Sequence, residues 1–383
     1  MGKNIRRLQP VSLSIILSLI LSLCMPTSVT FAASSSTALL TAKKDAEAKG
    51  YIFETSRDEI IAKSKKEGRL RVLFSLTPDS YPHITKAFKQ KYPFIELYLE
   101  EITGTDAAQR FLMELQAGVA RDWDIFRVSP DFYKELAGHA KKIDLLGMAE
   151  HQVLRIPPQM IDPERRNVIH AGSALGSIAY NKELISEGKV PNTWEDFLKP
   201  EFKGRKFLVD IRPLNFAPFA AALGEEWLVN YARRLKEQEP VWVRGHTRAL
   251  TAMASGEYAL YQLTNYHSCA LAQRQDPRKV LVCKLIEPIP VRLTVPQAIV
   301  YNAPRPYSAL LFLEFLASRE AQKIMDDIEP LKSSIYAPGS ELEKATKGKK
   351  VALETMESFP RTEKRIDMVV EAFGFPKAEK VKN

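Results

Sequence analysis

Residues 70–102 read LRVLFSLTPDSYPHITKAFKQKYPFIELYLEEI. The opening run, residues 70–76, is apolar and rich in β-formers, and it ends at a turn signal made of Thr, Pro and Asp. Ile84, Ala87 and Phe88 then recur at helical spacing, and the closing FIELYLEEI is again apolar and strand-like. This stretch therefore predicts a strand, a helix and a second strand in succession.

The same alternation continues along the chain. TGTDAAQRFLMELQAG (103–118) is typical of a helix that opens after Thr and Gly, WDIFRVS (123–129) of a strand, and PDFYKELAGHA (130–140) of a helix with Pro in its first turn. Strands that alternate with helices form parallel sheets covered by helices. The first part of the chain is thus predicted to be an α/β unit.

The pattern restarts in the second half of the chain. GSALGSIAYN (172–181) reads as a strand, NTWEDFLKPEFKG (192–204) contains a short capped helix, and RPYSALLFLEFLASREAQKIMDDI (305–328) reads as one long helix. The tail contains MVVEAFGF (368–375), which predicts one more helix. Because 383 residues exceed one typical core, we expect two α/β lobes with the chain crossing between them.

The first residues have the features of an export signal. Lys3, Arg6 and Arg7 precede an apolar run, residues 11–24, that is short for a membrane span, and small residues follow it. We predict that residues 1–32 are a cleaved signal peptide and that the chain is periplasmic. An uncleaved membrane anchor is the alternative. Residues 33–67 are a polar lead-in with one helix.

The charge pattern limits the classes of partner that the chain can bind, and the cysteine count limits the possible disulfides. The net charge of +9 includes three positive charges from Lys3, Arg6 and Arg7, which leaves +6 after cleavage. No Lys/Arg block is interleaved with aromatic residues, so nucleic-acid binding is not expected. Two cysteines remain, Cys269 and Cys283, and an oxidising compartment permits either a disulfide or two buried thiols.

Five fragments in the same order resemble type II substrate-binding proteins of ABC importers, most closely the branch of ferric-ion binders. They are EGRLRVLFS (67–75), GSIAYNKELI (176–185), PNTWEDFLKPEFKGRKFLVD (191–210), ALTAMASGEYALY (249–261) and YSALLFLEFLASREAQ (307–322). The resemblance implies two doubly wound lobes joined by hinge strands. Lobe 1 would contain residues 68–171 and 292–335, and lobe 2 residues 172–291 and 336–383.

The resemblance also implies a function. Such a protein binds a small molecule or ion between its lobes and delivers it to an ABC transporter permease, which is its only link to the membrane. We expect a monomer that is no enzyme and needs no cofactor. Two alternatives stay open: a ligand sensor on the same scaffold, or an exported enzyme that uses Cys269 and His267 as nucleophile and base.

Ligands of open α/β sheets lie beyond the carboxyl ends of the strands, and this rule selects the candidate binding residues. They are Ser75, Thr77, Gly104, Thr105 and Ser129 in lobe 1, and Arg212, Arg244, Tyr266 and His267 in lobe 2. The hydroxyl residues have a structural alternative as turn or cap residues, with Thr105 as the cap of its helix. Arg212 has an alternative as the ion-pair partner of Asp210.

Tyr266 and His267 also raise the question of a metal. In the ferric binders an Asn-Tyr-Tyr stretch at this place supplies two tyrosinate ligands, whereas this chain has Asn265-Tyr266-His267. Pro78 and Ser129 stand where those proteins have a ligand histidine and glutamate. Because Fe(III) favours oxygen ligands, a small anion held by Tyr266 and His267 is the preferred prediction. A metal on these two residues, or a purely structural His267, is the alternative.

Overall fold

The computed structural model describes the backbone of residues 28–375 and the side chains of residues 37–375. Most of the predicted signal peptide, residues 1–32, lies outside this part. The α-helices are α1 (Ser28–Ala48), α2 (Arg57–Glu67), α3 (Tyr81–Lys91), α4 (Thr105–Gln116), α5 (Tyr133–Gly138), α6 (Leu145–Glu150), α7 (Phe219–Leu223), α8 (Glu225–Glu237), α9 (His246–Ala254), α10 (Tyr266–Gln275), α11 (Pro306–Leu316), α12 (Arg319–Ile328), α13 (Glu341–Thr346) and α14 (Thr362–Phe373). None of the described helices is both long and apolar enough to cross a membrane.

The strands form one path of hydrogen-bonded neighbours in the order β2-β1-β3-β9-β4-β7-β5-β6, with β10 on β9 and β8 on β4. Their bounds are β1 (Arg69–Phe74), β2 (Glu96–Glu101), β3 (Ile125–Arg127), β4 (Val168–Asn181), β5 (Leu208–Asp210), β6 (Val241–Val243), β7 (Leu260–Asn265), β8 (Leu281–Lys284), β9 (Ile289–Ile299) and β10 (Val351–Leu353). The pairs β1–β2, β1–β3 and β5–β6 are parallel. The predicted α/β pattern is confirmed.

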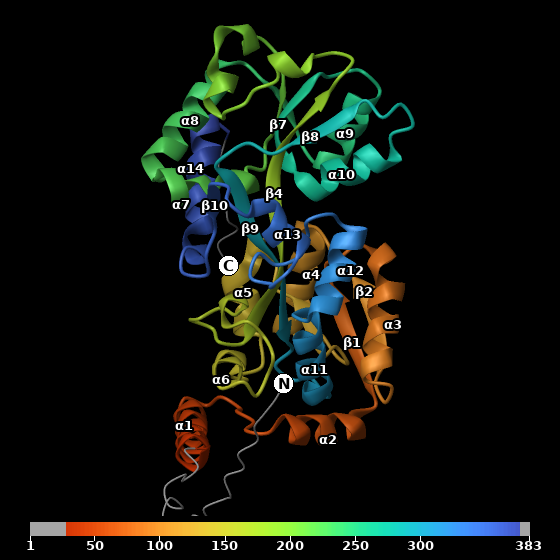
Figure 1. Ribbon diagram of the computed structural model, residues 1–383, viewed down its shortest axis with the longest axis vertical. Helices are drawn as coiled ribbons and strands as arrows, with labels where there is room; N and C mark the ends of the chain where they lie inside the picture. Colours follow the sequence, from red (N-terminus) through yellow and green to blue (C-terminus); the bar gives the residue numbers. More distant parts are fainter. Residues whose placement is uncertain (1–27, 376–383) are drawn as a thin grey trace, which may run out of the picture.

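Two long antiparallel strands join the lobes. The first half of β4 pairs with β9 from Val168 to Leu175, and its second half pairs with β7 from Gly176 onward. Figure 1 shows β4 and β9 running between a lower lobe, with β1, β2, α3 and α11, and an upper lobe, with β7, β8, α8 and α9. Every residue of β4 is buried, as expected of a strand covered on both faces.

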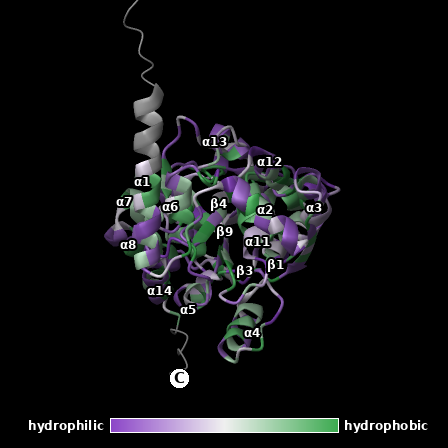
Figure 2. Ribbon diagram, turned by 90° about the horizontal axis from the view of Figure 1, so that it is seen from below, coloured by the Kyte–Doolittle hydropathy of each residue, from purple (hydrophilic) through white to green (hydrophobic). Residues whose placement is uncertain are grey.

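Each lobe has a hydrophobic core of its own. The largest cluster packs around Phe74, Phe88, Phe312 and Phe315, and a second cluster lies around Trp194, Phe216, Phe219 and Phe373. Figure 2 shows hydrophobic residues at the centre around β4 and β9, and hydrophilic residues on outer parts of α2 and α8. Burial of these aromatic side chains, at about 25 cal/mol per Å² of apolar surface, fixes the two lobes around the connecting strands.

The prediction of one long helix over residues 305–328 is wrong. The chain makes two helices, α11 and α12, because Ser318 leaves the helical conformation and becomes the N-cap of α12. Its Oγ accepts a hydrogen bond from the Ala321 amide at 3.4 Å and donates to the Phe315 carbonyl at 2.6 Å. A serine that satisfies backbone groups on both sides stops one helix and starts the next.

Two other segments also differ from the prediction. Residues 192–204 form short 3-10 turns, Glu195–Leu198 and Pro200–Phe202, instead of a capped α-helix, because Pro200 prevents the first turn from continuing. The capping pattern itself is present, since the Asp196 amide donates to Thr193 Oγ1. In the tail, α13 and β10 precede the predicted helix, and both are too short to give a periodic signal.

Candidate functional site

The stretch after β7 begins helix α10. Asn265 is the N-cap residue of α10, and Tyr266 and His267 form its first turn. The Asn265 side chain makes no capping hydrogen bond; its Oδ1 accepts from Asn215 Nδ2 at 3.0 Å and lies 3.4 Å from Nη2 of Arg292. The first amides of α10 therefore lack a side-chain cap, and a helix N-terminus in this state attracts anions.

Arg292, on β9, is the main cation beside this helix end. Its Nε donates to Asn215 Oδ1 at 2.7 Å, so the guanidinium is held by the amide oxygens of Asn215 and Asn265. Burial lowers its pKa, opposed by the carboxylate of Glu354. Within the described part of the chain, no carboxylate forms an ion pair with Arg292. A desolvated guanidinium held by neutral groups retains its capacity to bind an anion.

His267 faces cations from several parts of the chain. Its Nδ1 is buried and has no hydrogen-bond partner. Burial lowers the pKa of His267 well below the usual value, and the charges of Lys332, His246 and Arg292 lower it further. The imidazole is therefore neutral in the free protein. Lys332, which follows α12 and is buried, pairs with Glu329 at 3.4 Å.

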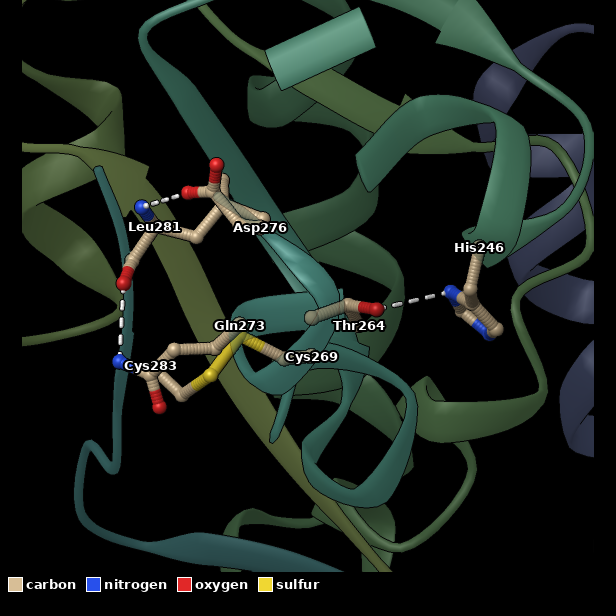
Figure 3. Close-up of a disulfide and its surroundings, with 7 residues drawn as sticks. All are labelled: His246, Thr264, Cys269, Gln273, Asp276, Leu281 and Cys283. Atoms are coloured by element: carbon tan, nitrogen blue, oxygen red, sulfur yellow. Dashed lines mark hydrogen bonds between the residues drawn. A yellow bond between two sulfur atoms is a disulfide. The ribbon is translucent and has the colours of Figure 1, made fainter. Parts of the chain in front are cut away.

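His246 begins helix α9, and its charge interacts with both His267 and Arg292. Its Nδ1 is 3.0 Å from both Tyr261 Oη and Thr264 Oγ1, and 3.9 Å from Asp210 Oδ2. Figure 3 shows the contact with Thr264. Burial lowers the pKa of His246 to about 4, although the Asp210 carboxylate raises it. His246 is thus held in place by hydrogen bonds inside lobe 2.

The two predicted arginines of lobe 2 differ from Arg292. Arg212 donates its backbone N–H to Asp210 Oδ1 at 2.9 Å, and its Nε is 3.7 Å from the same oxygen. The ion pair with Asp210 that we gave as the alternative is therefore present. Its charge still lowers the pKa of Arg292, so Arg212 lies near this guanidinium. Arg244 is exposed on the turn before α9.

The lobe 1 candidates lie at the ends of β1, β2 and β3. Ser75 and Ser129 each have a buried Oγ without a hydrogen-bond partner. The Thr77 amide donates to Glu329 Oε1 at 3.1 Å, which connects this turn to the end of α12. Gly104 and Thr105 stand at the start of α4 and are exposed.

One alternative in this lobe is wrong. Thr105 does not cap α4, because Gly104 occupies the N-cap position with a φ of 82°. The Thr105 hydroxyl donates instead to Asp131 Oδ2 at 2.8 Å. A positive φ favours glycine, which explains why the helix begins one residue before the position expected from its hydroxyl side chain.

Cys269 and Cys283 form a disulfide, which settles the alternative left open by the sequence. The bond joins α10 to β8, and Gln273 Nε2 donates to the Leu281 carbonyl at 2.8 Å beside it (Figure 3). The first turn of α10 is thereby tied to the sheet. The sulfur of Cys269 is not a free thiolate, so it cannot serve as a nucleophile with His267 as its base.

The structure brings Tyr266 and His267 together with residues that sequence reasoning missed, namely Arg292, Asn215 and Lys332. Tyr266 packs against an apolar cluster that includes Leu342 of α13. One feature of the sequence could have identified Arg292 as a candidate: it is a lone charge in the apolar run PVRLTV (290–295). No feature of the sequence identifies Lys332 as a site residue, because only the fold places it near α10. The described residues contain no group of three or more His, Cys, Asp or Glu able to hold a metal ion.

The comparison with protein families gives one match. A family model described as bacterial extracellular solute-binding protein matches residues 124–353, more than half of the chain. No curated protein matches the sequence.

Solved structures show the same fold. Iron-bound HitA from Pseudomonas aeruginosa is 18% identical with a TM-score of 0.60, and the match covers 79% of this chain and 99% of that one. Apo ferric ion-binding protein A from Pasteurella haemolytica is 18% identical with a TM-score of 0.61, covering 82% and 100%. AfuA from Actinobacillus pleuropneumoniae, with fructose-6-phosphate bound, is 19% identical with a TM-score of 0.53, covering 79% and 97%. These likenesses confirm the predicted two-lobed, type II binding-protein fold.

Proposed function

The chain belongs to the family of bacterial extracellular solute-binding proteins, and from this premise we propose that it captures a small anionic solute between its lobes and delivers it to an ABC transporter permease. We propose further that it acts as a periplasmic monomer after loss of residues 1–32. The two separate hydrophobic cores support the division into residues 68–171 with 292–335 and residues 172–291 with 336–383.

The proposal rests mainly on the surroundings of Arg292. Its side chain is half-buried, is bonded to the amide oxygens of Asn215 and Asn265, and lies beside the uncapped start of α10. An oxyanion there would accept charge-assisted hydrogen bonds from Arg292 and bonds from the first amides of α10. Tyr266 and His267 would add side-chain donors from the same turn.

A metal ion is the second candidate, because HitA and the other iron-binding neighbours share this fold. Tyr266 is the one ligand type retained at the matching place. His267, however, is surrounded by the cations of Lys332 and Arg292, which disfavour a metal ion through charge repulsion. The electrostatics of this helix end favour an anion.

Native mass spectrometry of protein purified without refolding, together with metal analysis, tests the choice. We expect a retained small anion and metal far below one equivalent. Iron at one equivalent with a visible tyrosinate absorption band would overturn the proposal.

Arg292→Gln is the sharper test. Loss of a charged hydrogen bond costs about 1.5–3 kcal/mol, so the retained anion should bind roughly 10- to 150-fold more weakly in calorimetry. The melting temperature of the ligand-free variant should stay near that of the parent, because glutamine can still bond to Asn215. Arg248→Gln, at an exposed position on α9, is the matched control and should bind as the parent does. Equal affinity of Arg292→Gln and the parent would refute the assignment.

A further inference from the structure

Lobe 1 contains a guanidinium that the proposed function does not use. Arg127 is the last residue of β3 and is half-buried. Burial lowers its pKa, and the one charge that raises it is the carboxylate of Asp131. In the described part of the chain the guanidinium of Arg127 has no hydrogen-bond or ion-pair partner. The nearby carboxylate oxygen Asp131 Oδ2 already accepts from the Thr105 hydroxyl at 2.8 Å. The Arg127 cation is therefore incompletely compensated.

Its neighbours carry polar atoms that also lack partners. Arg127 stands opposite Gln297 in the β3–β9 ladder, and both Nε2 and Oε1 of Gln297 are buried without hydrogen bonds. Ser129, two residues beyond Arg127, has a buried hydroxyl in the same state. A buried polar group that is left without a hydrogen bond destabilises the protein. A ligand at the carboxyl end of β3 would offset this cost.

This group is separate from the Arg292 site. The charged neighbours of Arg292 are Glu354 and Arg212, whereas the charged neighbour of Arg127 is Asp131. Gln297 and Arg292 are five positions apart on β9, which corresponds to about 17 Å of extended strand. The two guanidinium groups therefore belong to two distinct charge clusters.

Resting on the proposed function, we propose that Arg127, with Ser129 and Gln297, forms a second anion-contacting point, and that the solute is a small organic molecule with two anionic groups. Carboxylates and phosphates both match the planar fork of a guanidinium. One anionic group would bind at Arg292, beside the start of α10, and the other at Arg127, at the end of β3.

Calorimetry with matched probes tests this inference. The pairs are succinate with butyrate, adipate with hexanoate, and fructose 1,6-bisphosphate with fructose 6-phosphate. We expect at least one probe with two anionic groups to bind the parent protein about 10-fold or more tightly than its partner with one such group, in line with one added charged hydrogen bond. Arg127→Gln should remove this preference and leave the affinity for the partner unchanged. Arg121→Gln, an exposed arginine of the same lobe, is the control.

The outcomes separate this inference from the proposed function. The second contact point is wrong if Arg127→Gln keeps the preference for the probe with two anionic groups. It is also wrong if the parent binds both members of each pair equally; in either case anion binding at Arg292 stands. If Arg292→Gln binds every probe as the parent does, the proposed site is wrong. If the parent binds none of the probes, both the anion site at Arg292 and the second contact point at Arg127 are wrong. Circular dichroism and melting of Arg127→Gln verify that the variant is folded.

Discussion

At the scale of single residues, several histidines are neutral because they are buried. His170, on β4, is fully buried; its Nε2 lies 3.4 Å from Tyr133 Oη, which donates to Asp162 Oδ2 at 2.6 Å. Burial lowers the pKa of His170 to about 4, although Asp162 raises it. An unfolded histidine has a pKa of about 6.5, so the unfolded chain takes up a proton between these values while the native protein does not. Above pH 6.5 the histidine is neutral in both states and its titration does not affect stability, whereas the fold loses stability as the pH drops from about 6.5 toward 4.

We therefore expect His170→Gln to weaken the acid sensitivity of the fold. The difference between pKa values of about 6.5 and about 4 corresponds to about 3 kcal/mol, of which about 2 kcal/mol is lost between pH 7 and pH 5. Urea unfolding at pH 7 and pH 5 should show a smaller loss of unfolding free energy in the variant than in the parent. His83→Gln, at an exposed position, should lose as much as the parent. Identical losses in all three proteins would contradict the assignment.

At the scale of elements, α10 is the helix on which the site depends. Its first turn holds Tyr266 and His267, and the disulfide from Cys269 to Cys283 ties that turn to β8. The helix has ten residues, too few to be stable by itself. Tertiary contacts and the disulfide therefore keep the first amides of α10 in a fixed orientation toward Arg292.

Replacing both cysteines by alanine should lower the free energy of unfolding by about 3 kcal/mol, the value for a loop of this size. Cys269 and Cys283 are separated by 14 positions in the sequence. Urea unfolding with and without reductant measures the effect: the reductant should lower the stability of the parent to that of the double variant and leave the variant unchanged. A parent whose stability does not respond to complete reduction would show that the bond constrains little.

At the scale of the whole molecule, β4 and β9 connect the lobes, and the tail crosses as well. After α13, strand β10 pairs with β9 at Ile289, and α14 packs in the core of lobe 2 through Val369 and Phe373. Glu354, just after β10, accepts from the Leu293 amide at 3.3 Å, and its carboxylate raises the pKa of Arg292. Three chain segments thus pass between the lobes close to the proposed site, and we therefore expect ligand binding to be coupled to lobe movement.

Binding of the solute identified by mass spectrometry should close the lobes. Small-angle X-ray scattering should record a smaller radius of gyration with ligand, and thermal unfolding should show about 2.7 kcal/mol of added stability at a ligand concentration 100-fold above Kd. Arg292→Gln, which should bind roughly 10- to 150-fold more weakly, should gain only about 0.3–1.4 kcal/mol at the same concentration. Stabilisation without contraction in the parent would mean that the solute binds to one lobe alone.

The sequence by itself determined the class of fold, the family and the place of Tyr266 and His267. These features depend on local periodicity and on motif order, which any stretch of chain carries within itself. It did not reveal the break at Ser318, where one hydroxyl outweighs helix propensity, and it left the pairing of Cys269 with Cys283 undecided. Only the tertiary structure decided which charged and polar side chains lie near one another. Arg292, Lys332 and His267 come from β9, the segment after α12 and α10, and Arg127 meets Gln297 through strand register. Charge interactions and desolvation depend on distances across the fold, and the order of residues along the chain does not contain those distances.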